Sequence, residues 1–210
     1  TCPRRGQVVK MTSNVVRVET TPRLGESMRD VRGDSVKRQI QADHGIEISE
    51  VRSIVGYLIS SAISSEQISE RVDDVFADPI IEESVTDTFH LENKDLFSSG
   101  YDMAITIAFK PGVTDNPGNA ALDGFRTIFP DAGEDARIST YITYVFNGVP
   151  EGVKVDWLAK QLHNGLIERA IHSSSIEAIP SIEYAPIIPS DYAKPAIIDL
   201  EAVSYTHLTL

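Results

Sequence analysis

The sequence predicts an α+β fold in which one small unit of strand, helix, strand, helix and strand occurs twice. Matching residue types recur at an offset of 85 or 86 positions on either side of a polar segment at 91–100. The 210 residues allow two units of roughly 80 residues, and each would be marginal alone because small domains bury little surface. We therefore expect two tandem units packed as a pseudo-dimer. The matching pairs are Asp30 and Asp115, Gly33 and Gly118, Ser53 and Ser139, Val72 and Leu158, Phe76 and Leu162, Ile80 and Leu166, Ile81 and Ile167, and Glu82 and Glu168.

Composition shifts divide the chain into six expected segments. Met11 directly precedes the first strand-like run, so the residues before it are interpreted as a leader outside the native protein. Several prolines near the C-terminus predict an extended linker to a further domain. In order, the segments are a leader at 1–13, a first copy at 14–90, a linker at 91–100, a second copy at 101–178, a proline-containing linker at 179–202 and a tail at 203–210 that resembles a translated sequencing adapter.

Apolar periodicity predicts five elements in the first copy. Gly45 is expected to end the first helix, because glycine readily takes the left-handed conformation of a C-cap. Either Ser64 or Ser65 is expected to cap the second helix. The expected elements are a strand at 15–21, a helix at 34–41, a strand at 51–59, a helix from the serine cap to Phe76, and a strand at 80–85.

The second copy repeats this order. Because the residue before a proline avoids helical angles, we expect Asn116 to be the cap of its first helix and Pro117 the first helical residue. We also expect a hairpin bend at Asn147 and Gly148. Two helices on one side of a small sheet form a ferredoxin-like arrangement, and two such sheets either pack face to face or join edges. The strands are expected from Met103 onward, at 138–146 and at 166–171, and the second helix at 155–162.

The composition excludes several classes of function. The chain has 31 acidic and 19 basic residues, a formal charge of -12, which repels nucleic acids and anionic membranes. It contains no apolar run long enough to span a membrane. Cys2 is the only cysteine, so neither an internal disulfide nor a thiolate metal cluster can form. The expected compartment is the cytoplasm.

Two short motifs carry a resemblance to a known family. Residues 110–120 read KPGVTDNPGNA, and the segments 78–82 and 164–168 read DPIIE and NGLIE. These segments resemble the two signatures of the small subunit of phosphoribosylformylglycinamidine synthase. The first copy keeps the second signature. In place of the first signature it has a longer segment, in which residues between Arg23 and Met28 add about three positions relative to the second copy. The resemblance covers about 15–179 of the chain.

Two such units followed by a proline-containing linker are similar to the start of the large subunit of this synthase. The resemblance implies a role in purine biosynthesis, in which the complete enzyme uses ATP, Mg and glutamine-derived ammonia to make an amidine. It implies a non-catalytic scaffold that organises the synthetase domain of the same chain and a glutaminase domain or subunit. The residues that bind ATP would follow position 202.

The residues alone predict no catalytic, cofactor-binding or metal-binding site. There is no phosphate-binding glycine loop, nucleophile elbow or histidine pair at ligand spacing, and Gly112 and Gly118 are better explained by turns that need a positive φ. Lys110 ends a strand and is expected either to be exposed or to meet an anionic group on a neighbouring domain. Trp157 lies off the apolar face of its helix, which predicts a contact with a partner or the twin unit, or ordinary partial burial. The candidate interface or motif residues are Lys110, Gly112, Asp115, Gly118, Trp157, Glu82 and Glu168.

Two other functions remain open at this stage. One is a small-ligand sensor of paired ferredoxin-like units, with an effector bound at the seam between the copies. The other is an independent enzyme, which would require a convergent polar cluster that the sequence does not display.

Overall fold

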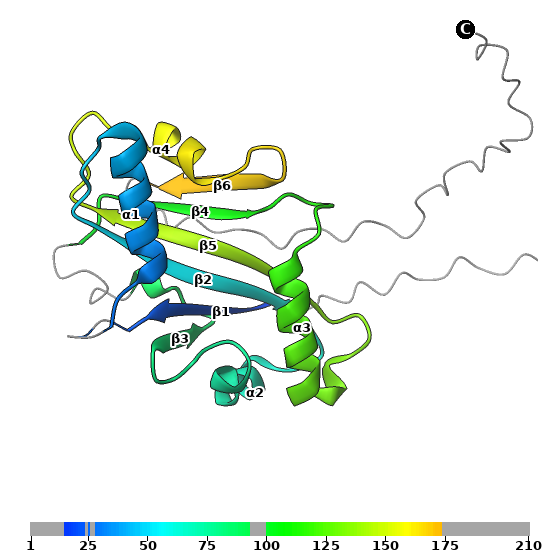
Figure 1. Cartoon of the computed structure of the whole chain (residues 1–210). Coiled ribbons are helices and arrows are strands. Elements are labelled where there is room, and N and C mark those ends of the chain that lie inside the picture. The colour runs from blue at the N-terminus through cyan, green and yellow to red at the C-terminus, as the bar shows by residue number, and fades with distance from the viewer. Residues whose placement is uncertain (1–14, 24, 26–27, 93–99, 174–210) are drawn as a thin grey trace, which may run out of the picture.

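The fold is a two-layer α+β arrangement with one six-stranded antiparallel sheet (Figure 1). The structure is a computed structural model that describes residues 15–23, 25, 28–92 and 100–173. The strand order is β3-β1-β2-β5-β4-β6. The expected leader and the two C-terminal segments at 179–202 and 203–210 lie outside the described residues. In the part of the chain that is described, no helix combines the length and the apolar character that a membrane crossing requires.

The first half contains three strands and two helices in the expected order. Asp30 caps α1 and Gly45 ends it in a left-handed conformation, so this helix is three residues longer at each end than expected. Ser64 caps α2 through a capping box with Gln67, but α2 ends at Glu70 and a 3-10 turn at Val72–Asp74 follows. The elements are β1 (Val15–Pro22), α1 (Val31–His44), β2 (Glu50–Ser60), α2 (Ser65–Glu70) and β3 (Glu82–Thr86).

The second half has the same order, with two differences from expectation. The cap of α3 is Asp115 rather than Asn116, because the carboxylate of Asp115 reaches the amide of Gly118 at 2.7 Å. The expected hairpin at Asn147 and Gly148 is wrong, since β5 ends there and the chain continues to α4. The elements are β4 (Met103–Phe109), α3 (Asn116–Ile128), β5 (Arg137–Asn147), α4 (Val155–Leu162) and β6 (Glu168–Ser173).

The two halves join at their strand edges. β2 and β5 pair antiparallel along their full length, from Glu50 opposite Asn147 to Ser60 opposite Arg137. This pairing leaves β3 and β6 as the outer strands of a continuous sheet. Edge joining, rather than face-to-face packing, is therefore the arrangement that forms.

The pairing of the strands shows that β1 and β2 match β4 and β5 at an offset of 87 positions, rather than the 85 or 86 expected from residue types. Val16 pairs with Ile59, and the residues 87 positions later in both strands, Met103 and Phe146, also pair. The aspartate that caps the first helix binds Ser53 in one half and Thr140 in the other. The structural counterpart of Ser53 is therefore Thr140, and the expected match with Ser139 is wrong by one residue.

The apolar core combines the halves. α1 and α3 lie across one face of the sheet, as Figure 1 shows, while α2 and α4 lie near its outer strands. In one cluster Ile68 and Phe76 of the first half pack with Phe125 of α3. In the other, Ile40 of α1 packs with Leu158 of α4. Each main cluster thus draws helices from both halves, so the halves share one interior.

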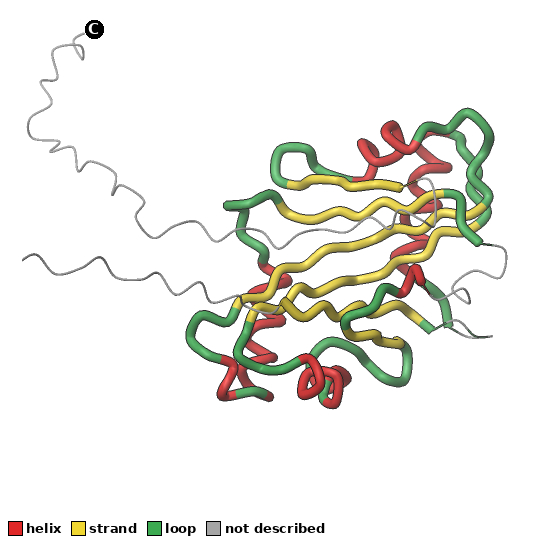
Figure 2. Tube along the Cα trace, turned by 180° about the vertical axis from the view of Figure 1, so that it is seen from behind, coloured by secondary structure: helices red, strands yellow, loops and turns green. Residues whose placement is uncertain are grey.

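Residues 87–92, which follow β3, lie on the face of the sheet that α1 and α3 leave uncovered (Figure 2). On this face Leu91 packs against Ile54 of β2 and Val145 of β5. The ring of Tyr141 occupies the space where a side chain at Gly56 would lie, and its hydroxyl donates to Glu19 Oε1 at 2.5 Å. Residues 87–92 are held to the sheet by the apolar contacts of Leu91 and by the hydrogen bond from the amide of His90 to Glu19.

Candidate functional site

The second signature forms the same hydrogen-bonded corner in both halves. In the first corner Glu82 Oε2 accepts from the amide of Asp78 at 3.1 Å, and Asp78 Oδ1 accepts from the amide of Ile80 at 2.9 Å. In the second, Glu168 Oε2 accepts from the amide of Asn164 at 2.7 Å, and Asn164 Oδ1 accepts from Leu166 at 3.0 Å. Both glutamates are thus used to close a turn before the outer strand.

A basic residue directly after β1 or β4, the strand that pairs with the outer strand, binds each corner. The amide of Arg23 donates to the carbonyl of Ile81 at 2.8 Å, and the amide of Lys110 donates to Ile167 at 2.9 Å. The Lys110 ammonium also donates to the carbonyl of Gly165 at 2.5 Å. Lys110 therefore binds the corner of its own half.

Asp30 and Asp115 tie each first helix to the middle strand of its half. Asp30 is buried and accepts from the amide of Gly33 at 2.8 Å and from the amide and hydroxyl of Ser53 at 2.5 and 2.8 Å. Asp115 accepts in the same way from Gly118 and from Thr140, whose amide lies at 2.6 Å. Each carboxylate therefore caps a helix and anchors a strand together.

Glycine is needed at the start of α1 and of α3 because a larger side chain would clash with the neighbouring strand. A Cβ at Gly33 would lie 2.1 Å from the carbonyl oxygen of Val51, and one at Gly118 would lie 2.5 Å from that of Ile138. Gly112 differs, because its φ of 87° is the positive value that a turn requires. The expected explanation by positive φ thus holds for Gly112 but is wrong for Gly118.

Trp157 contacts the other half of the chain. It is partly buried on α4, and its ring meets the edge of His44 at the end of α1 with the ring centres 4.9 Å apart. The side chain therefore bridges the seam between the two halves, as one of the expected alternatives has it.

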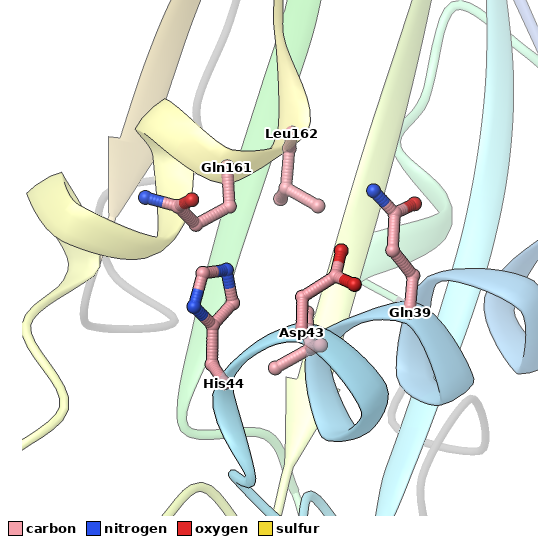
Figure 3. A pocket seen from close by; sticks show the side chains of 6 residues that line it. Gln39, Asp43, His44, Gln161 and Leu162 are labelled. Atoms are coloured by element: carbon pink, nitrogen blue, oxygen red, sulfur yellow. The ribbon is translucent and has the colours of Figure 1, made fainter.

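A small cavity lies at this seam. Figure 3 shows Gln39, Asp43 and His44 of α1 facing Gln161 and Leu162 of α4. Its volume is about 50 Å³. Sites for small molecules usually measure roughly 300–1,000 Å³, so this space suits only a few water molecules.

A much larger cavity lies beside the start of α1. It has a volume of about 850 Å³, between the first helical turns and the first corner. The sequence analysis overlooked it because its arginines follow no recognised spacing, although three of them within positions 23–32 stand out in an acidic chain. Its basic side chains are Arg23, Arg29 and Arg32, and its apolar ones are Pro22, Met28, Val31 and Ile81.

Arg32 acts on tyrosines of both halves. Burial raises the pKa of Tyr57 on β2 and of Tyr144 on β5, and the Arg32 guanidinium opposes this rise for both phenols. These two tyrosines lie on β2 and β5, the strands that meet at the seam.

A buried polar cluster on the other face involves three titratable side chains. Glu19, His90 and Tyr141 are each at most 4 % exposed. The main-chain amide of His90 donates to Glu19 Oε2 at 2.8 Å. Burial lowers the pKa of the His90 imidazole, and burial together with the Glu19 carboxylate raises the pKa of the Tyr141 phenol. The hydrogen bonds of His90 to Glu19 hold residues 87–92 against β1.

The described side chains and the comparisons with known proteins give no further indication of what these sites do. Among the described side chains, no three histidine, cysteine, aspartate or glutamate groups gather in a way that could hold a metal ion. No protein-family model and no curated protein matches the chain.

Proposed function

We propose that the chain is a pair of tandem ferredoxin-like units arranged as a pseudo-dimer, which serves as the non-catalytic N-terminal scaffold of a phosphoribosylformylglycinamidine synthase. The observation that carries the proposal is the corner formed by the second signature, which has the same hydrogen bonds in both halves. The order of strands and helices is also the same in both halves. The segment that resembles the family's second signature therefore forms the same turn before the outer strand in both halves.

The corners also provide surfaces on which partners could dock. Ile80 is 72 % exposed in the first corner and Leu166 is 85 % exposed in the second. The corners precede β3 and β6, the two outer strands of the sheet. Exposed apolar side chains at matched positions are typical of protein contacts.

The mechanism of such a scaffold is positional. A continuous sheet holds the two corners at a fixed separation, so domains bound there would keep a fixed orientation. Fixed active sites would allow ammonia released by a glutaminase to reach the synthetase domain of the same chain without escaping to water. In this proposal ATP and Mg bind to the synthetase domain, and the parent enzyme acts in the cytoplasm.

Covalent linkage of the two units supports assembly. Fusion makes the association intramolecular and so lowers its entropic cost. Because each apolar cluster uses helices from both halves, we expect residues 14–90 and 101–178 expressed separately to be unstable until mixed. Analytical ultracentrifugation and circular dichroism test this expectation, and two stable monomers that do not associate would contradict the pseudo-dimer.

The scaffold role is tested in the full-length protein with Ile80→Asp and Leu166→Asp. Both side chains are exposed, so the fold should persist. Amidine formation supported by glutamine should fall severalfold, while formation supported by added ammonium should be unchanged. Ala62→Asp, an exposed loop substitution with the same charge change, is the control. Equal loss with both nitrogen sources, or no amidine formation by the wild-type protein, would contradict the proposal.

The alternative of a sensor with an effector at the seam is not favoured by any observation. The cavity between α1 and α4 is about 50 Å³, too small for a nucleotide or an amino acid. A thermal-shift screen with these ligands, run on the wild-type protein and on Arg29→Gln, distinguishes the two functions, because an effector bound at the seam would stabilise both proteins equally.

A further inference from the structure

We propose that the cavity beside the start of α1 binds a small molecule that carries a phosphate monoester. This inference goes beyond the scaffold role and does not depend on it. The cavity volume of about 850 Å³ lies within the roughly 300–1,000 Å³ that is usual for small-molecule sites. It opens between the first turns of α1 and the corner at Ile81 and Glu82.

The charges that line the cavity favour an anion. Arg29 and Arg32 are exposed, and within the described residues neither guanidinium forms a hydrogen bond or an ion pair. Two carboxylates, those of Asp30 and Glu82, also line the cavity, and both are already engaged, because Asp30 accepts from main-chain amides and Glu82 accepts from the amide of Asp78. Arg23 adds a third positive charge to the lining. Three cations are thus concentrated in a chain whose net charge is -12.

The chemistry of the arginine side chains favours phosphate. A guanidinium presents parallel N–H donors that match two oxygens of a phosphate, so an arginine pair is well suited to a dianion. The apolar part of the lining predicts that the ligand is larger than inorganic phosphate. Val31 is 72 % exposed and Ile81 is 51 % exposed, and the organic part of an ester would cover them.

The second half of the chain provides an internal comparison. The helix starts match at Asp30 and Asp115, which aligns Arg29 with Thr114 and Arg32 with Pro117. Proline carries neither a guanidinium nor a main-chain N–H. The same backbone in the second half therefore has neither of the two unpaired arginines, and we assign the site to the first half only.

The test is a calorimetric titration of the full chain with phenyl phosphate, inorganic phosphate and benzoate at low ionic strength. We expect phenyl phosphate to bind most tightly, since it offers both a dianion and an apolar group. Arg29→Gln and Arg32→Gln should each weaken its binding about tenfold, as expected for loss of a charge-assisted contact. Arg38→Gln makes the same charge change on the same helix outside the cavity and should leave the dissociation constant unchanged.

Two further measurements keep the proposal falsifiable. Arg32→Pro copies the residue that α3 tolerates at this position, so it should preserve the helix by circular dichroism and still weaken binding about tenfold. Added salt should weaken binding, because the arginines are exposed. The proposal is overturned if wild-type protein does not bind phenyl phosphate, if benzoate binds as tightly, or if Arg38→Gln weakens binding as much as the cavity variants do.

Discussion

The two halves share their corners but differ around the first helix. In both, a carboxylate caps the helix and a glycine lets it approach the middle strand. The first half has Arg29 and Arg32 at its helix start, whereas the second half has the uncharged Thr114 and Pro117 at the matching positions. Groups that satisfy buried main-chain donors are hard to replace, because an unpaired donor is costly, while exposed side chains change freely. The comparison shows which residues maintain the fold and which can acquire a separate role.

The helix-free face differs between the halves as well. Around Glu19 the first half has a charged cluster, with a hydrogen bond from the Tyr141 hydroxyl. At the position that matches Glu19, the second half has Thr106, whose hydroxyl pairs with Thr143 at 2.7 Å. Burying a neutral hydroxyl pair costs less free energy than burying a carboxylate, so the cluster around Glu19 depends more strongly on its hydrogen bonds.

The largest effect should come from filling the space at the helix starts. Gly33→Ala forces a Cβ to within 2.1 Å of a main-chain oxygen, and Gly118→Ala to within 2.5 Å. We expect losses in the free energy of unfolding of about 3 kcal/mol or more for the first and about 2 kcal/mol for the second. Urea denaturation followed by circular dichroism measures both.

Gly124→Ala is the matched control for these two variants. Gly124 lies in α3, and a Cβ there would meet nothing closer than 3.9 Å. Alanine should therefore stabilise the helix by about 0.5–1 kcal/mol. If Gly33→Ala changed the free energy of unfolding as little as this control does, the close contact between α1 and β2 would be contradicted.

The next effect concerns the two capping carboxylates. Asp30→Asn and Asp115→Asn each replace one acceptor oxygen with a donor that faces main-chain amides. The loss should be about 2–3 kcal/mol at the buried Asp30 and about 1–2 kcal/mol at the more exposed Asp115. Chemical denaturation of both variants gives the comparison. Equal losses of unfolding free energy in the two variants would show that the greater burial of Asp30 does not make its contacts more important than those of Asp115.

A smaller effect follows from the buried His90. Burial lowers the pKa of its imidazole, although the carboxylates of Glu19 and Glu83 oppose this shift. The unfolded chain therefore binds a proton that the folded chain does not, and stability should fall as the pH drops below about 6.5. One such proton changes the free energy of unfolding by at most about 1.4 kcal/mol per pH unit.

The measurement for this pH effect is denaturation between pH 8 and pH 5.5. His90→Gln cannot take up the proton, so the slope of stability against pH should be shallower than in the wild-type protein. An unchanged slope would show that another group causes the pH dependence.

The smallest effect should come from the contact between His44 and Trp157 across the seam. His44→Ala removes an edge-on ring contact at 4.9 Å and should cost about 0.5 kcal/mol. Trp157 is the only tryptophan, so its fluorescence reports this contact directly and should change in the variant. Arg38→Ala, an exposed change on the same helix, should leave the emission unchanged, and a similar shift in both variants would count against the contact.

Much of the local structure could be predicted from residue patterns. Alternating β-branched residues located β1, β2 and β5 to within a residue at each end, and Gly45 and Ser64 marked helix ends through their own backbone and side-chain chemistry. The early end of α2 was not predicted, and Phe76, which lies beyond it, packs against Phe125 of the other half with the ring centres 6.1 Å apart. Contacts between residues far apart in the chain leave no local period.

The sequence by itself determined the repeated order of elements, the end of α1 at Gly45 and the two corners. The hydrogen bonds that build a corner join residues at most four positions apart, so neighbouring residue types suffice to specify them. Only the tertiary structure decided that the halves join through β2 and β5, and that the helices of one half cover clusters shared with the other. It also brought the distant corner at Ile81 and Glu82 beside the three arginines, which creates the cavity. These outcomes depend on burial and charge between distant residues, which a pattern of neighbours does not encode.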